Sequence, residues 1–547
     1  MKKARRWSWR RWARRSRVTE NQIVGEQRLI LNSRRRASAK YLEEAPLYFA
    51  GGKEDIDPKR GLAINGPADR STDGPETIRL GIVSDATGIQ DVSTWATWIN
   101  DNPVRSIDEV GFMSQVFPGF IKAFNCRIAV SRDFNEQITS SEIGNILTIA
   151  NPNLRIRRTS ELYASKVENV CRRVSVPDVI VCHTPEEVEK KCAAGMSYRV
   201  KREGALTGEE KQKAEVIREN VRTHIILQEL DEDTLNLLEM AVNQDFRANL
   251  KAICLRFDTP IQILSQSTLT AMNEGITLQP LKSKRRQDAA RIAWNLAVAI
   301  YYKSNRFPWR VGNLLSGTCY IGVSFYIDKT SGDRETFASL AQVFTDTGEG
   351  MVVRGESFRS GTEGRGFLRL TEEGASSLLA RAIEVYSKHH NGQPPNRVVI
   401  HKSSRYSDNE IRGFRQALGN IPKFDFVTIG SGRDVFVYRN GDYPIVRGTT
   451  IQLSTESFFL FSNGYIPYLR QYDGPRVPRP LEISERHGDT PPEELAREIL
   501  ALTRLNWNTT DYCCFEPITL EFSRRVGEIL GKVPPGEKTQ EQYRYYM

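Results

Sequence analysis

The sequence contains eight cysteines, but no two of them are separated by two residues as in a CxxC pair. Neither a zinc ribbon nor a disulfide scaffold is therefore indicated, and a reducing cytoplasm is the simplest compartment. No stretch approaches the ~20 uninterrupted apolar residues of a membrane-spanning helix, so we expect no membrane segment. The six histidines show no metal-ligand spacing apart from the adjacent pair His389 and His390.

The composition is that of a globular chain with an excess of positive charge. Its 547 residues are 39% hydrophobic and 26% charged, which favours two or three folded units. Lys and Arg number 77 against 67 Asp and Glu, and the net charge of +10 favours polyanionic partners. Residues 1–17 carry nine Lys or Arg but lack the apolar run of a secretory signal. We interpret residues 1–40 as a basic tail.

Strand and helix patterns divide the rest of the chain. Residues 41–75 read as a short strand and a linker. In residues 76–310, strands alternate with helices, which is typical of a parallel α/β sheet. The strands expected there are 78–83, 177–182, 224–230 and 252–257, with a long helix at 287–303. Residues 311–547 read as a second α/β unit, with strands that include CYIGVSFYI, DVFVYR and TTIQLS and with helices near 370–389 and 408–418.

Four polar residues of the first unit could form one site. Arg247 and Lys251 are four apart in a probable helix, so both project from one face. Gln262 follows in TPIQIL, and Lys303 ends the long helix. Converging at the carboxyl edge of a parallel sheet, they would make a pocket for a terminal phosphate. By spacing alone, a solvated helix face is the commoner explanation of the Arg–Lys pair. The residues that compete with Lys303 are Lys284, Arg285, Arg286 and Arg291.

These residues resemble a known motif. Arg247, Lys251 and Gln262 are similar to the phosphate-binding motif of the Argonaute MID domain, and WNLAVAIYYK resembles the helix that supplies the motif's lysine. YIGVSFYID, RVVIHKSSRYSDNEIRGFRQAL and LTRLNWNTTDYCCFEPITLEFSRRVGEIL resemble a PIWI domain. LYFAGGKEDIDPKRGLAINGP, IRLGIV and VFPGF look like the short prokaryotic Argonautes, which lack PAZ. The resemblance implies a Rossmann-like MID domain at 76–310 and an RNase H-like PIWI domain at 311–547.

The same resemblance predicts that the cutting centre is inactive. Active PIWI domains hold two metal ions with carboxylates. The first expected Asp would follow IGV at 321–323, where the chain has Ser324, and the second is expected after VVIH, where the chain reads Lys402, Ser403 and Ser404. A serine hydroxyl is a neutral and weak ligand for a hard divalent ion. Ser324 and Ser403 therefore predict that no metal pair is held.

Other acids lie near these positions. Asp328 lies four residues past Ser324, outside the expected strand position, and Asp408 is expected to cap the helix at 409–418. Glu356 is a third nearby acid, and we do not expect it to serve as a ligand. The last catalytic position should fall within PITLEFSRR, where Glu521 and Arg524 are the candidates.

The resemblance implies a guide RNA with a 5′ phosphate, a DNA target that is recognised but not cut, and a partner protein. That partner would contain an APAZ region and a sirtuin-like, TIR or nuclease effector, acting in defence against phages and plasmids. The chain end would return to the pocket, where the terminal carboxylate of Met547 can share Mg²⁺ with the phosphate. Two alternatives stay open: an active guided nuclease that uses displaced acids, and a nucleic-acid-binding protein without a guide.

Overall fold

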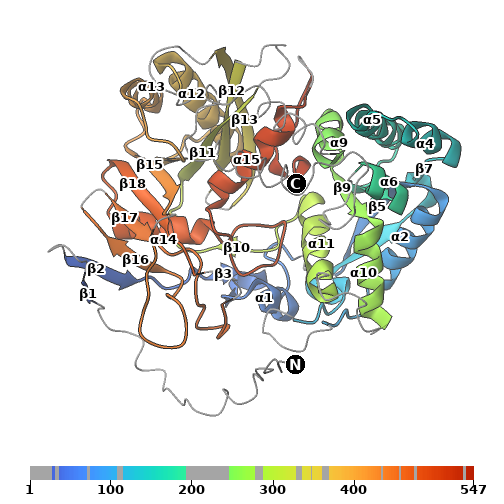
Figure 1. Ribbon diagram of the computed structural model, residues 1–547, viewed down its shortest axis with the longest axis horizontal. Coiled ribbons are helices and arrows are strands. Elements are labelled where there is room, and N and C mark those ends of the chain that lie inside the picture. Colours follow the sequence, from blue (N-terminus) through green and yellow to red (C-terminus); the bar gives the residue numbers. More distant parts are fainter. Residues whose placement is uncertain are drawn as a thin grey trace, which may run out of the picture.

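The described residues form two large β-sheets and one small sheet, as seen in a computed structural model (Figure 1). Helices cover the faces of both large sheets; one buried core continues from the first sheet to the second, and each sheet also packs against a separate core on its other face. The structure describes residues 28–30, 36–70, 74–106, 115–192, 246–277, 288–327, 336–345, 348–359, 369–432, 435–454, 457–472, 477–533 and 537–547.

A parallel sheet forms the first unit. Its strands lie in the order β6-β5-β8-β9, and each neighbouring pair is parallel. Residues 179–182 of this sheet are apolar and buried throughout, which is typical of a strand covered on both faces. The predicted parallel α/β sheet is confirmed. Its strands are β5 (Glu76–Ser84), β6 (Cys126–Val130), β7 (Glu136–Gln137), β8 (Val179–Thr184) and β9 (Ile261–Ser265).

Helices cover both faces of this sheet. Tyr163 and Phe246 pack edge to face on one side, with ring centroids 5.6 Å apart, and Trp95 and Trp294 belong to the core on the other side. The helices are α2 (Ala86–Trp98), α3 (Phe120–Phe124), α4 (Ser140–Leu147), α5 (Pro152–Cys171), α6 (Glu186–Cys192), α9 (Phe246–Cys254), α10 (Gln266–Thr277) and α11 (Ala289–Lys303).

One expected strand of this unit is a helix. The sequence pattern predicts a strand at 252–257, but its first residues are the last turn of α9. Phe246, Leu250 and Cys254 are all buried at a spacing of four residues, so the apolar periodicity is helical once the preceding residues are included. The strand expected at 224–230 lies outside the described residues.

A second sheet of ten strands forms the other unit. Its core order is β13-β12-β11-β14-β15, in which β11, β12 and β13 are antiparallel and β11, β14 and β15 are parallel. This is the RNase H-like arrangement expected from the sequence. The core strands are β11 (Thr318–Ile327), β12 (Thr336–Phe344), β13 (Gly350–Arg359), β14 (Arg397–Lys402) and β15 (Lys423–Ser431).

Helices cover this sheet on two sides, with α12 and α13 on one face and α15 on the other (Figure 1). Beyond β15 the sheet continues through β18, β17 and β16. These elements are α12 (Glu372–His389), α13 (Asp408–Leu418), β16 (Thr449–Gln452), β17 (Phe458–Leu460), β18 (Leu481–Gly488), α14 (Pro492–Leu502) and α15 (Ile518–Leu530).

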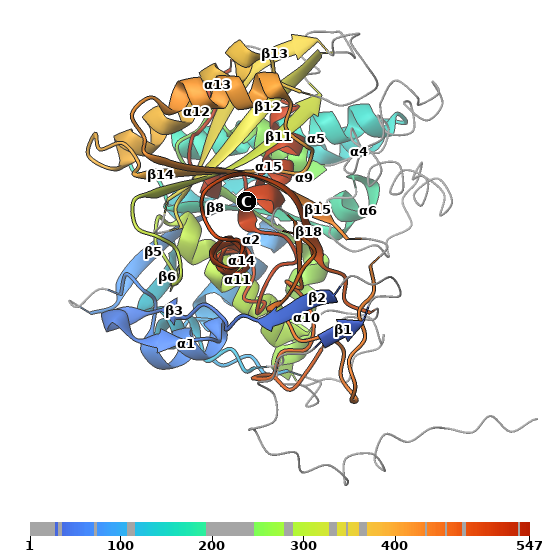
Figure 2. The same cartoon turned by 90° about the vertical axis from the view of Figure 1, so that its left-hand side faces the viewer.

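The beginning of the chain joins this second sheet. Strand β2 (Arg36–Tyr41) pairs with β16 (Figure 1), and β1 (Arg28–Ile30) pairs with β2 (Figure 2). The interpretation of residues 1–40 as a tail is therefore wrong for 28–30 and 36–40, because their backbone groups are paired in a sheet. A small sheet and a helix follow, in which the last strand comes from the chain after the first unit. These elements are β3 (Leu47–Tyr48), β4 (Glu54–Asp55), α1 (Pro58–Asn65) and β10 (Arg310–Val311).

The expected strand DVFVYR is also absent in its described part. Residues 435–439 have no regular secondary structure. Val435 and Val437 pack against a small core, whereas Phe436 and Tyr438 are exposed. The side chains therefore alternate between the inside and the outside, as they would in a strand. It belongs to a segment that pairs with no described strand of the sheet.

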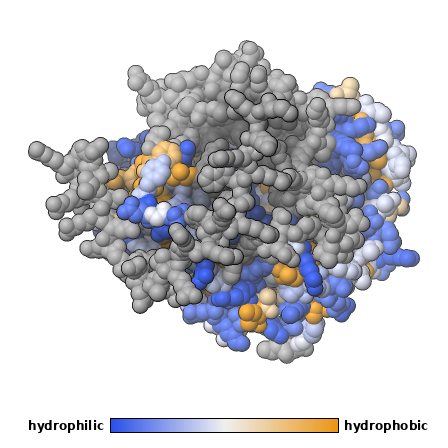
Figure 3. Space-filling view, turned by 60° about the horizontal axis from the view of Figure 1, so that its bottom comes forward, coloured by the Kyte–Doolittle hydropathy of each residue, from blue (hydrophilic) through white to orange (hydrophobic). Residues whose placement is uncertain are grey.

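The described residues visible in Figure 3 form no single broad apolar area, because hydrophobic residues lie there in small groups among hydrophilic ones. Among the helices that the structure describes, none combines the length and apolar character needed to span a bilayer.

The contact between α15 and β11 gives a test of the fold. A Cβ atom added at Gly322 would lie 1.8 Å from the carbonyl oxygen of Thr519 in α15. We expect Gly322→Ala to lower the free energy of unfolding by about 1–3 kcal/mol or more, because the backbone must shift. Gly144→Ala in α4 is the control, since its Cβ would meet open space, and a gain of about 0.5–1 kcal/mol is expected there. Urea denaturation measures both, and equal stabilities of the two variants would contradict the packing.

Candidate functional site

The structure brings the four residues of the predicted pocket to one region. Arg247 and Lys251 lie on α9, Gln262 lies on β9, and Lys303 is the last residue of α11. The Lys303 amine donates a hydrogen bond to Oε1 of Gln262 at 2.5 Å. Lys251 and Lys303 are each only 2% exposed. Two lysines that are far apart in the sequence are thus both buried beside the same parallel sheet.

The competitors of Lys303 do not take its place in the described residues. Arg291 lies in the first turn of α11, at the opposite end from Lys303, and forms an ion pair with Asp511 at 2.8 Å. Residues 284–286 lie outside the part of the chain that the structure describes.

The positively charged form of the buried Lys303 amine is electrostatically unfavourable. Burial lowers the pKa of Lys303 well below its usual range, and the positive charge of Arg247 lowers it further, while Cys182 acts in the opposite direction. The amine donates to a neutral amide oxygen, that of Gln262. A buried cation that is held by a neutral group is costly, so an anion placed here would stabilise the charged lysine.

The end of the chain closes this region. Residues 543–545 form a short 3₁₀ helix, and the Lys251 amine donates to the carbonyl oxygen of Tyr546 at 3.0 Å. Gln540 donates to the carbonyl of Phe257 at 3.0 Å, and the Tyr545 hydroxyl donates to the carbonyl of Asp258 at 2.9 Å. The segment therefore packs against α9 and the turn that follows it.

The two serines of the expected metal centre lie on neighbouring strands. Ser324 is on β11, and its hydroxyl donates to the carbonyl oxygen of Ser523 in α15 at 3.1 Å. Ser403 follows the end of β14, which pairs in parallel with β11, and is exposed. Lys402, just before it, is buried and forms an ion pair with Glu410. Both expected metal-ligand positions therefore carry neutral hydroxyls.

The nearby acids have other partners. Glu521 pairs with Arg524 at 3.0 Å and with Arg525 at 2.6 Å. The expectation that Asp408 caps its helix is wrong, because Ser407 is the N-cap and forms a capping box with Glu410.

The other two nearby acids are Asp328 and Glu356. Asp328 lies beyond the described residues, as does the side chain of Glu356. Within the described residues, no group of three or more His, Cys, Asp and Glu side chains is arranged to hold a metal ion.

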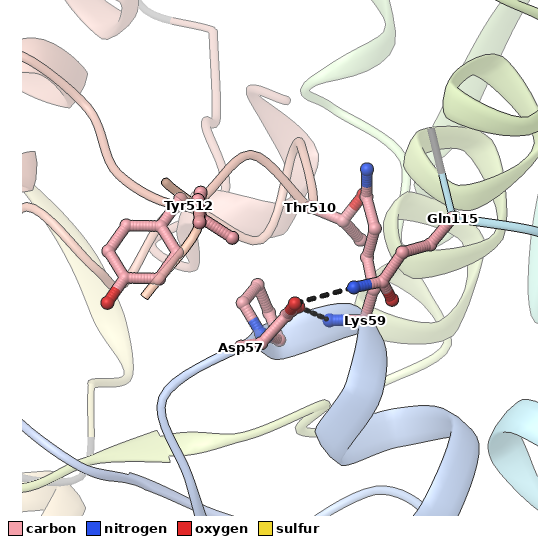
Figure 4. A pocket seen from close by; sticks show the side chains of 7 residues that line it. Asp57, Lys59, Gln115, Thr510 and Tyr512 are labelled. Carbon is pink, nitrogen blue, oxygen red and sulfur yellow. Dashed lines mark hydrogen bonds between the residues drawn. The ribbon is translucent and has the colours of Figure 1, made fainter. Parts of the chain in front are cut away.

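A small cavity lies where three distant segments meet (Figure 4). Asp57 accepts hydrogen bonds from the Gln115 amide at 2.6 Å and from the backbone N–H of Lys59 at 2.9 Å, with Thr510 and Tyr512 opposite. Its volume of about 10 Å³ is the space of one water. The cavity is therefore part of a joint between α1, the first unit and the second, and is too small for a substrate.

Similarity to known proteins is found at the level of structure. No protein-family model matches the sequence, and no curated protein matches it. Clostridium butyricum Argonaute bound to a guide DNA and a 19-mer target DNA is similar, with a TM-score of 0.59 and 15% identity over 91% of this chain and 54% of that one. The chain has the fold of an Argonaute.

Two further structures support the Argonaute fold. Drosophila Piwi matches with a TM-score of 0.55 and 13% identity, over 94% of this chain and 57% of that one. Aa-Ago with externally bound siRNA matches with a TM-score of 0.52 and 13% identity, over 94% and 56%. The chain thus spans a little over half the length of these Argonaute structures.

The buried His401 predicts an acid-sensitive contact beside the two serines. Its Nδ1 lies 2.9 Å from the Thr519 hydroxyl, and burial, then Arg397, lowers its pKa to about 3. The unfolded chain takes up this proton below about pH 6.5, whereas the folded chain does not until about pH 3. Stability is therefore lost as the pH falls through this window, by up to about 1.4 kcal/mol per pH unit.

We expect His401→Gln, which keeps a polar partner for Thr519, to remove this part of the pH dependence. Urea denaturation of both proteins at several values between pH 7 and pH 4 measures it. The difference in unfolding free energy between the two should change with pH, and a constant difference would show that folding does not lower the pKa of His401.

Proposed function

We propose that this chain binds the 5′ phosphate of a guide RNA and uses the guide to recognise a complementary DNA target. The observation that carries the proposal is the buried amine of Lys303, which has a neutral amide acceptor and the positive charge of Arg247 beside it. A terminal phosphate supplies several acceptor oxygens and up to two negative charges. It therefore compensates the buried charge better than a neutral ligand does.

The roles of the other residues follow from their positions. Arg247 and Lys251 would contact the phosphate from α9, and Gln262 would orient Lys303 and donate its amide N–H groups. Mg²⁺ is proposed as an additional counter-ion of the phosphate. It would supply charge neutralisation, while the chain's own cations hold the anion.

We propose that recognition of the target does not lead to cutting by this chain. Ser324 and Ser403 are neutral, and the neighbouring Glu521 is neutralised by two arginines, so the carboxylates needed to hold two metal ions are not supplied by these residues. The output would then come from a partner protein with an APAZ region and an effector, in defence against phages and plasmids in the cytoplasm. Guide–target pairing would activate it by shifting a conformational equilibrium, which requires the partner to favour the duplex-bound state.

The phosphate site predicts a selective loss of affinity. Lys251→Ala should weaken binding of a 5′-phosphorylated guide by roughly tenfold to a hundredfold, because a charge-assisted hydrogen bond is lost. Binding of the same guide with a 5′ hydroxyl should change little. Fluorescence anisotropy with the two guides measures the difference.

Lys190→Ala is the matched control, because Lys190 is an exposed lysine of α6 in the same unit. It should affect both guides equally. If Lys251→Ala also weakens both guides equally, the phosphate does not occupy this site.

The proposed absence of cutting predicts that the purified chain, loaded with a guide, leaves a complementary strand intact in Mg²⁺ or Mn²⁺. Gel electrophoresis of a labelled target measures cleavage. The matched positive assay is the activity of the co-purified partner, which should appear only with guide and target together. Guide-directed and metal-dependent cleavage by the homogeneous chain would overturn this part of the proposal.

A further inference from the structure

Loops of the second unit display aromatic rings and arginines on the surface. Phe436, Tyr438 and Tyr443 are 46%, 73% and 39% exposed, so three aromatic rings that are close in the sequence reach the solvent. Arginines lie on the same and neighbouring loops. We call this set the aromatic–arginine surface; it comprises Phe436, Tyr438, Tyr443, Arg439, Arg470 and Arg479.

The rings of this surface are held in place from below. The ring of Tyr443 stacks on Tyr465 with centroids 4.2 Å apart and an interplanar angle of 21°. Tyr465 is only 9% exposed, so it anchors the outer ring to the body of the protein. Arg439 lies 5.5 Å from the Tyr465 ring centroid, and its Nε donates to the Tyr443 carbonyl at 3.1 Å. The outer ring and the guanidinium are thus fixed side by side.

The segment that carries Phe436 and Tyr438 is also anchored. Val435 and Val437 pack on a small core, so the two aromatic residues between and after them project outward. The guanidinium of Arg479 lies 5.3 Å from the centroid of the Phe436 ring. An arginine therefore lies against an aromatic ring both at Tyr465 and at Phe436.

The arginines of this surface carry charge that the described residues do not neutralise. Within those residues, Arg439, Arg470 and Arg479 form no ion pair with a carboxylate. The neighbouring Arg447 differs, because it is buried and pairs with Glu44 at 2.7 Å. The surface therefore offers positive charge to a ligand, whereas Arg447 holds the fold together.

We propose that the aromatic–arginine surface binds single-stranded nucleic acid, with bases stacked on Tyr438 and Tyr443 and phosphates held by Arg439 and Arg470. Stacking on exposed rings is independent of base sequence, and arginines attract the phosphate backbone. Every nucleotide of a single strand carries both a flat base and a phosphate, so one ligand matches the exposed rings and the arginines together. The proposal is independent of the guide-binding function, because it involves no end of the strand.

A circular single-stranded oligonucleotide of thymidines tests this surface, because a closed circle has no 5′ end to enter the site at Lys303. Fluorescence anisotropy should give an affinity at least about tenfold lower for the double variant Tyr438→Ala/Tyr443→Ala than for the unaltered chain. The variant Tyr438→Phe/Tyr443→Phe keeps both rings and should restore binding. Failure of the phenylalanine variant to restore binding would contradict stacking.

The charge is tested separately with the same circle. Arg470→Gln should reduce the slope of log affinity against log salt concentration by roughly 0.7, the value for one phosphate contact on a single strand. Arg381→Gln, at an exposed arginine of α12, is the matched control and should leave the slope unchanged. Unchanged circle binding in the alanine and glutamine variants overturns the proposal. So does loss of a co-purifying protein with circle binding retained, which would make the surface a protein interface.

Discussion

The packing of the chain's last residues against α9 joins the two units at the site. Residues 537–547 extend from the second unit and hydrogen-bond to the turn after α9 through Gln540 and Tyr545, while Lys251 reaches the carbonyl of Tyr546. Helix α15 of the second unit also contacts α9. We call the site formed by Arg247, Lys251, Gln262 and Lys303 the cationic site. Its geometry therefore depends on the position of the second sheet relative to the first.

Strong local patterns were enough to predict several parts of the fold. Strand β8 is uniformly buried, and α11 places its small and aromatic residues in the core while ending at Lys303. The four residues of the cationic site could be chosen from helical spacing together with a resemblance to a known motif. Their spacing alone could not separate a pocket from a solvated face, because burial of Lys251 and Lys303 arises from the approach of other elements.

Other features could not be predicted from local sequence patterns, because they depend on contacts with segments that are distant in the sequence. The apolar residues at 252–257 suit a strand, but the first three of them end α9. Residues 435–439 alternate like a strand but pair with no described strand. Strand β2 lies in a basic stretch, and it is a strand because its backbone pairs with β1 and with the distant β16. The arginine pairing of Glu521 likewise depends on the turn of α15 that brings its partners into reach.

The pairing of β2 with β16 affects how the chain folds during synthesis. Its partner β16 comes far later in the sequence, as the hydrogen bond from Thr450 to Lys40 shows with a separation of 410 positions. Local structure in the first unit can form as soon as that unit leaves the ribosome, whereas the pairing of β2 with β16 must wait for most of the chain. During synthesis the edge of β2 that later faces β16 is open to pairing with other chains, and the positive charges of Arg36 and Lys40 disfavour such pairing between copies. Slow translation of the second unit would lengthen that exposure.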